Sequence, residues 1–169
     1  MTEPSAIHVP AGAGRPVWVF GDTYTVKVTA DDTGGALGFV EATVPPGSGP
    51  RPHAHTHEDE SFYVLSGEVR ITHGKRSFLA RAGDFVFIPK RTVHRFRNES
   101  VHAARLLFWY TPGGFERFFL EAGFPARPGE LPDQPDPARM AVMARIAVSH
   151  GWQPGPGALD ELDTNLGRQ

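Results

Sequence analysis

Short runs of strand-forming residues, each closed by a turn, constrain the fold of this chain more than any other feature. The runs are rich in Val, Ile, Phe, Thr and Tyr, and most Gly and Pro residues between 34 and 114 fall in the gaps between them. About nine short antiparallel strands with tight links predict an all-β domain closed as a barrel or a sandwich. The expected strands are 17–20, 24–29, 36–44, 61–65, 68–72, 77–79, 85–88, 94–97 and 104–110.

The hydrophobic period changes after residue 112. From Phe115 to Ala122 apolar residues recur at i, i+3, i+4 and i+7, with Glu116 on the opposite side, which predicts a short amphipathic helix that plugs one barrel end. A Pro-rich connector, 125–135, leads to a second helix with Asp136 as N-cap, continuing to about residue 150. The polar face of this second helix is narrow, so we expect it to be well buried.

These patterns divide the chain into four parts. Residues 1–16 form an N-terminal arm, with a strand candidate at 7–9, and residues 17–112 form the barrel. Residues 113–151 form a C-terminal helical segment that packs on the barrel, and 152–169 form a tail.

Composition and charge exclude several classes of protein. Lys and Arg total 17 against 19 Asp and Glu, a net charge of −2 without a basic run, so nucleic acid is not an expected partner. No apolar run approaches the roughly 20 residues that cross a membrane, and no secretion leader is recognisable, so we expect a cytoplasmic protein without a membrane partner. There is no cysteine, so any metal must be held by nitrogen and oxygen.

Three of the eight histidines crowd into residues 51–60. Residues two apart on a strand point to the same face, so His53 and His55 can converge on one point. Glu60 adds a carboxylate after a short bend, and His94, after the 85–88 strand, is the expected fourth donor. Three imidazoles and one carboxylate suit a divalent transition metal, and a six-coordinate ion would keep two positions for water or substrate.

The remaining histidines have other interpretations. In an extended segment the Cα of His57 lies about 13 Å from that of His53, which is too far for both to bind one ion. We assign His57 to the pocket rim or an exposed turn, and it is the main rival of Glu60 as a catalytic base. Two histidines two apart are by themselves often solvated loop residues, and the isolated histidines are interpreted as structural or solvated: His8, His73, His102 and His150.

Two motifs carry a family resemblance. The first, Gly47-x5-His53-x-His55-x4-Glu60-x6-Gly67, matches every fixed residue of the first cupin motif. The second cupin motif is similar to Gly83-x5-Pro89-x-Arg91-x2-His94-x3-Asn98, in which Arg91 replaces the usual glycine. This departure concerns the conformation of the turn, and the ligand is present. Over residues 17–123 the chain resembles single-domain bacterial cupins of the quercetin dioxygenase-like type, particularly at 58–67, 82–89 and 110–116.

The resemblance implies a fold and a ligand set. The fold would be a double-stranded β-helix, the cupin jelly-roll barrel, with short C-terminal helices. The ligands of one divalent metal (Fe, Mn, Ni, Co, Cu or Zn) would be His53, His55, Glu60 and His94. Phe62, Val64 and Phe96 share strand parity with these ligands, so they should face the interior as core residues and as a wall of the substrate pocket.

The sequence leaves three functions open. The first is a metal-dependent dioxygenase acting on a phenolic or enolic small molecule, whose proton Glu60 would accept. The second is a redox-neutral isomerase, cyclase or lyase that uses the metal as a Lewis acid, and the third is a cupin that binds a small molecule without turnover. We also expect a homodimer, formed by exchange of an exposed edge strand near residues 7–9.

Overall fold

The structure is a computed structural model that describes residues 5–132 and 136–157. It confirms the all-β fold class, with two antiparallel sheets and two helices in the described part of the chain. The strands are β1 (Arg15–Val19), β2 (Asp22–Val28), β3 (Gly38–Val44), β4 (His53–His55), β5 (Asp59–Ser66), β6 (Glu68–His73), β7 (Arg76–Arg81), β8 (Phe85–Ile88), β9 (His94–Arg97), β10 (Ala104–Thr111), β11 (Phe124–Pro125) and β12 (Trp152–Pro154). The helices are α1 (Glu116–Ala122) and α2 (Pro137–Ser149).

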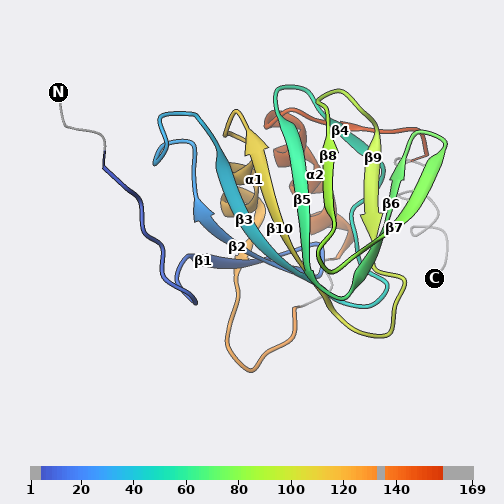
Figure 1. The fold of residues 1–169 in the computed structure, drawn as a ribbon, viewed down its shortest axis with the longest axis horizontal. Coiled ribbons are helices and arrows are strands. Elements are labelled where there is room, and N and C mark those ends of the chain that lie inside the picture. Colours follow the sequence, from blue (N-terminus) through green and yellow to red (C-terminus); the bar gives the residue numbers. More distant parts are fainter. Residues whose placement is uncertain (1–4, 133–135, 158–169) are drawn as a thin grey trace.

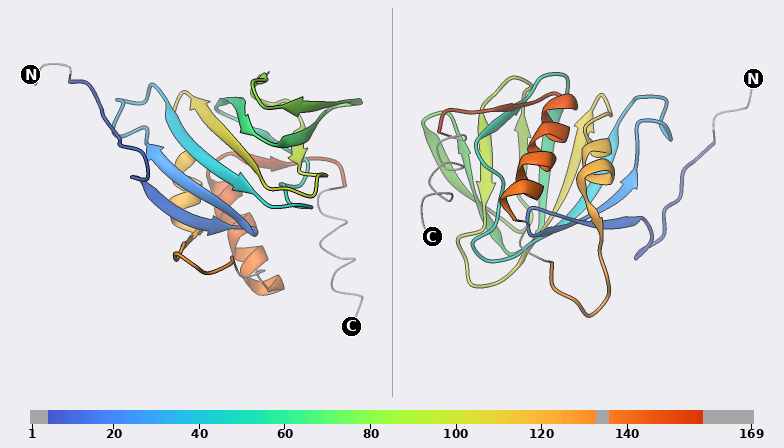
Figure 2. Two further views of the ribbon diagram at one scale, coloured as in Figure 1. Left: turned by 60° about the horizontal axis from the view of Figure 1, so that its bottom comes forward. Right: turned by 180° about the vertical axis from the view of Figure 1, so that it is seen from behind.

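Two sheets enclose the core. The larger has the order β11-β1-β2-β3-β10-β5-β8 and the smaller has the order β12-β4-β9-β6-β7. Both helices lie on one side of the larger sheet, behind β3, β10 and β5 in Figure 1 and in front of them in the right panel of Figure 2. Two such antiparallel sheets are the jelly-roll arrangement. The helices do not cover the other face of the larger sheet.

Alternation along the strands decides which side chains enter the core. In β3 and β10 buried residues alternate with partly or fully exposed ones, so every second side chain points inward. The fully buried members include Val40 of β3 and Leu106 and Phe108 of β10. On β4, β5 and β9 some of the inward-facing side chains are polar, and these form the candidate site.

The end of the chain differs from the sequence-based expectation. Residues 152–169 were expected to form a tail, but Trp152–Pro154 is strand β12 and pairs with β4. The cause is the exposed edge that β4 would otherwise present, which β12 covers with backbone hydrogen bonds. Residues 158–169 lie outside the described residues. At the other end, 7–9 is not a strand, and Ile7 is half exposed.

Helix α1 plugs the barrel as expected, with one correction. Phe118, Phe119 and Ala122 are buried, and Phe115 is buried at the N-cap position. Glu116, expected on the polar side, is also completely buried. Its carboxylate accepts hydrogen bonds from the backbone N–H groups of Ala30 and Gly114, each 2.7 Å away. These two loop donors need an acceptor inside the protein, and Glu116 provides it.

Helix α2 starts where the sequence predicts but is less buried than expected. Asp136 is the N-cap and accepts from the backbone N–H of Arg139 at 2.8 Å. Only Met143 and Ala147 are fully buried, while Val148 is 54% exposed. The helix covers the barrel with a single face, because no second layer packs on its outer side in the described residues. Neither helix described here has the length and apolarity needed to cross a bilayer.

The departure from the second motif is visible in the backbone. Arg91, where the motif usually has glycine, has φ +62°, which lies in the left-handed region. Its N–H donates to the carbonyl of His55 at 2.7 Å and so ties the turn before β9 to β4. The turn therefore keeps the glycine-type conformation despite the side chain, at a cost of the order of 1 kcal/mol.

Candidate metal centre

Four side chains from three strands converge inside the barrel. His53 and His55 lie on β4, His94 lies on the neighbouring β9, and Glu60 lies on β5 of the other sheet. His53 and His94 are register partners, and the side-chain donor atoms of the four residues all lie within 4.8 Å of one another. Each residue is no more than 6% exposed. The sequence-based ligand set is thus brought together in one buried cluster that spans both sheets.

Backbone carbonyls fix the orientation of two imidazoles. Nδ1 of His53 lies 2.8 Å from the carbonyl oxygen of Arg51, and Nδ1 of His94 lies 2.9 Å from that of Thr92. A carbonyl oxygen only accepts, so each Nδ1 carries the hydrogen and donates it. Nε2 of both rings is therefore directed to the centre, which is the usual way in which a second partner orients a ligating histidine.

Glu60 is the hub of the cluster. Its Oε2 lies 2.7 Å from Nε2 of His94 and 3.2 Å from Nε2 of His55. Burial disfavours the negative charge, but His55 and His94 outweigh burial and hold the pKa of the Glu60 carboxyl well below its usual range. Burial, together with the rings of His94 and His55, holds the pKa of His53 well below its usual range. An anionic carboxylate and a neutral imidazole are the forms that bind a metal.

The donor set fits a divalent transition metal. Both ring nitrogens of His55 are buried without a hydrogen-bond partner among the described residues, although its Nε2 lies beside Glu60. A buried nitrogen lone pair without a partner is costly unless something binds it. Three imidazole nitrogens and one carboxylate oxygen at this spacing match a mononuclear transition-metal site, and no feature of the cluster selects one metal.

A cavity of about 200 Å³ adjoins the cluster. His53 and Glu60 line it from the metal side, and most of the remaining wall is aromatic. Trp152 of β12 covers His53, with stacked rings at a centroid distance of 5.7 Å. The other lining residues are Val19, Phe20, Tyr24, Gly49, Pro50, Arg51, Phe96, Phe108, Tyr110, Phe115, Phe118, Phe119, Met140, Ala144 and Ala147.

Two tyrosines, Tyr24 and Tyr110, add hydroxyl groups to the cavity wall. Tyr110 is the register partner of Glu60 on the neighbouring strand, and burial and the nearby Glu60 carboxylate raise its pKa well above the usual value. Tyr24 donates from its hydroxyl to Asp22 at 3.1 Å. Asp22 is buried, and burial raises its pKa to about 7 despite hydrogen bonds from Ser48 and Tyr24.

The structure distributes the remaining sequence-based site residues differently. Phe96 lines the cavity, while Phe62 and Val64 pack in the core, with the Phe62 ring centroid 6.1 Å from that of His94. His57 is exposed on the turn between β4 and β5, close to Gly151, and is not part of the cluster. Its catalytic role stays a prediction. Tyr24, Tyr110 and Trp152 were not predictable as site residues from the sequence, because their participation depends on strand pairing across the barrel.

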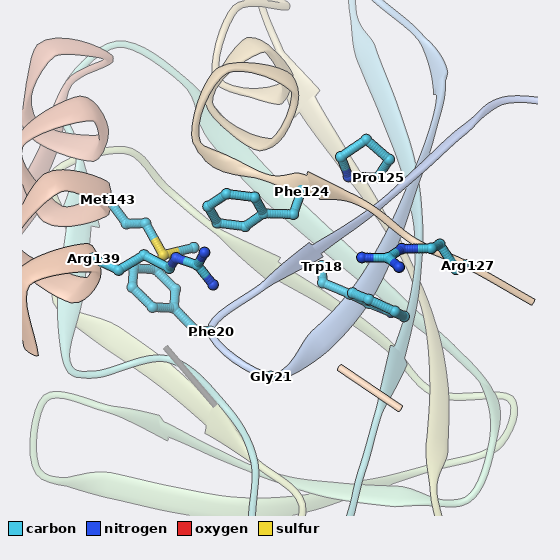
Figure 3. A pocket seen from close by; sticks show the side chains of 8 residues that line it. All are labelled: Trp18, Phe20, Gly21, Phe124, Pro125, Arg127, Arg139 and Met143. Carbon is cyan, nitrogen blue, oxygen red and sulfur yellow. The ribbon is translucent and has the colours of Figure 1, made fainter. Parts of the chain in front are cut away.

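A second hollow of about 230 Å³ is also lined by Phe20. Figure 3 shows its eight lining residues, with Arg127 near Trp18. The Arg139 guanidinium carbon lies 4.1 Å from the centre of the Phe124 ring. None of the eight residues belongs to the cluster of metal-ligand candidates. Phe20 lines both hollows.

The fold and the buried cluster define a jelly-roll protein with a mononuclear metal-type site, and comparisons with known proteins agree. The cupin domain family matches residues 40–110. Quercetin 2,3-dioxygenase of Bacillus subtilis is 27% identical over 129 residues, which is 76% of this chain and 38% of that protein. Polyketide synthase CurC of Streptomyces cyaneus is 32% identical over 90 residues, or 53% of this chain and 57% of that protein.

A solved structure agrees with the fold. An RmlC-like cupin from Shewanella frigidimarina superposes with a TM-score of 0.57 at 17% identity, over 66% of this chain and 96% of that chain. The match to the cupin domain family over residues 40–110 and the jelly-roll fold together support a cupin superfamily protein. The chain matches less than two thirds of the length of the two curated relatives named above.

Proposed function

We propose that this cupin is a metal-dependent dioxygenase that acts on a phenolic or enolic small molecule. The observation that carries the proposal is the position of the buried His₃Glu cluster at the wall of an aromatic cavity. Such a cavity suits a flat, largely apolar substrate that presents one or two oxygens to the metal. The name of the Bacillus subtilis relative supports this substrate class.

His53, His55, Glu60 and His94 would hold the ion. When bound, a divalent ion would supply Lewis-acid polarisation of a substrate oxygen and, if redox-active, a route for electrons to dioxygen. The chain's own part is proton transfer and positioning. Glu60 is anionic, and both imidazole contacts involve its Oε2, so neither engages Oε1. We assign Glu60 as the base that takes the substrate hydroxyl proton.

The aromatic wall has two effects on this chemistry. Phe108, Phe115 and Trp152 make the wall beside the cluster apolar, which strengthens the charge interactions inside the cavity. Tyr110, beside Glu60, is protonated at neutral pH like any tyrosine, and its raised pKa extends this to more alkaline pH. It therefore acts as a hydrogen-bond donor that orients the substrate or the carboxylate.

A redox-neutral isomerase, cyclase or lyase is the second candidate. It is favoured by the proximity of Glu60 and Tyr110, because a base beside a neutral acid suffices for proton shuttling without dioxygen. The Streptomyces cyaneus relative is named a polyketide synthase protein, and polyketides are rich in enolisable carbonyl groups.

One experiment separates the candidates. The chain is reconstituted in turn with Fe, Mn, Ni, Co, Cu and Zn, and oxygen uptake and product formation are followed with a panel of phenols and diketones. The proposal predicts oxygen-dependent turnover with a redox-active metal and none with Zn. Turnover that persists without oxygen or with Zn indicates the redox-neutral enzyme, and binding without turnover indicates a non-enzymatic cupin. His94→Ala should abolish activity, and His102→Ala, an exposed loop change, is the control.

A further inference from the structure

The face of the larger sheet that points away from the helices carries an unusual apolar surface. Its members come from four adjacent strands, β3, β10, β5 and β8, and all occupy outward positions in the pleat. We call this surface the outer face; it consists of Phe39, Tyr63, Leu65, Phe85, Phe87, Leu107 and Trp109. Phe85 is 57% and Phe87 50% exposed. Figures 1 and 2 show that α1 and α2 cover the opposite side of the sheet.

The rings of the outer face are already ordered. Trp109 stacks on Phe39 at a centroid distance of 6.2 Å and on Phe85 at 5.6 Å. The three rings therefore form a row across β3, β10 and β8, passing over β5 where the small, buried Ser61 lies next to Trp109 in register. Side chains fixed in this way lose little conformational freedom when a partner covers them.

The area of the outer face matches the apolar part of a dimer interface. With about 200 Å² for a fully exposed large side chain, its four most exposed members present roughly 350 Å² per copy, and the three half-buried members add more. A standard interface buries about 800 Å² on each partner, and somewhat more than half of that area is apolar. The largest apolar patch on a typical monomer is itself about 300–600 Å² and is often functional, so the size of the outer face suits a binding surface.

The charges around the outer face fit a second copy of the same chain. Glu41 and Arg105 form an ion pair on the β3–β10 side, and Asp84 and Lys90 flank edge strand β8 in the sequence. These four residues are two acids and two bases, so a two-fold axis can bring acidic groups of one copy opposite basic groups of the other. The chain's net charge of −2 gives little repulsion between copies.

We propose that two copies of this chain pack outer face to outer face in solution. The homodimer expected from the sequence would then form through the sheet face and not through an exchanged strand near residues 7–9. Ser61, the residue after Glu60 on β5, points outward. In such a dimer the partner copy would therefore cover the outer side of β5 at the position where Glu60 points inward. The proposal does not depend on the reaction that the site catalyses.

Sedimentation velocity at micromolar concentrations tests this arrangement. The wild-type chain should sediment as a species of twice the 18.4 kDa monomer mass. Phe85→Glu should give monomers with unchanged circular dichroism, and the milder Phe85→Ser should raise the dimer Kd at least about tenfold. Val101→Glu, at an apolar side chain that is 82% exposed outside the outer face, should leave the dimer unchanged.

Two results would overturn the proposal. One is a wild-type chain that stays monomeric throughout the concentration range. The other is a dimer that persists with wild-type affinity in Phe85→Ser and in a folded Phe85→Glu variant, because the contact would then lie elsewhere on the molecule.

Discussion

Nε2 of His94 lies 2.7 Å from Oε2 of Glu60, although the two residues are 34 positions apart and belong to different sheets. This contact joins the two halves of the barrel at the point where the cavity begins. It also places the only acidic member of the cluster next to a histidine that a backbone carbonyl holds in position.

Glu60→Gln should separate metal binding from proton transfer. The amide keeps the size of the side chain but cannot accept a proton at neutral pH, so turnover should fall about 100-fold or more even when excess metal refills the site. The measurement is the rate at full metal occupancy, checked by metal analysis. His57→Ala is the comparison, and near-normal turnover in Glu60→Gln with a collapse in His57→Ala would show that His57 is the base.

Arg91→Gly should stabilise the protein by about 0.5–1 kcal/mol, because glycine adopts the left-handed backbone at residue 91 without strain. Urea denaturation at fixed metal content measures the change. Lys90→Gly, at the preceding exposed residue without a positive φ, should instead destabilise. Equal losses in both variants would mean that the turn at Arg91 is not strained.

Asp22→Asn should change how stability depends on pH. The pKa of Asp22 is raised to about 7 in the fold, mainly by burial, and returns to about 4 on unfolding. Below pH 4 the Asp22 carboxyl is protonated in both the folded and the unfolded state, so it does not change the free energy of unfolding. Between pH 4 and 7 the unfolded chain ionises first, so the wild type loses stability, by up to about 4 kcal/mol.

The asparagine variant lacks this loss. Its stability relative to wild type should therefore rise between pH 4 and 7 and stay level above pH 7, while the titration of other groups cancels in the difference. Urea midpoints from pH 4 to 8 measure this difference. A difference that does not vary with pH would show that Asp22 titrates normally in the folded protein.

Glu116→Ala should be strongly destabilising, although the residue does not touch the cluster. It removes the acceptor of two N–H groups, those of Ala30 and Gly114, inside a buried site, and each unsatisfied donor costs about 1–3 kcal/mol. Thermal unfolding measures the effect. Glu121→Ala, an exposed change on the same helix, should cost far less, and equal losses would argue against the buried clamp.

Local patterns made much of the fold predictable. Alternating hydrophobicity located the principal strands, and helical spacing located α1 and α2. The four metal-ligand candidates were predictable because His53, His55 and Glu60 lie close together in sequence at fixed spacings, and His94 follows a recognisable turn. What the structure adds to the site is their convergence across two sheets.

Residues whose role depends on distant partners were not predictable. From the sequence, Trp152 belongs to a Gly- and Pro-rich tail. Only the pairing of its strand, β12, with β4 places it over His53. Glu116 sits on the polar side of an amphipathic helix, and only the loop donor at Ala30 explains its burial. Val148 on α2 is exposed because no element in the described residues packs on the outer side of this helix, and the sequence pattern of the helix does not show that.

The most direct test of the account is the metal content of protein purified without added metal and then reconstituted. Wild type should hold about one divalent ion per chain, and the ion should raise the thermal stability. His94→Ala should empty the site or weaken binding steeply, whereas His102→Ala should bind like wild type. Unchanged metal occupancy in His94→Ala would contradict the assignment of the four-residue site.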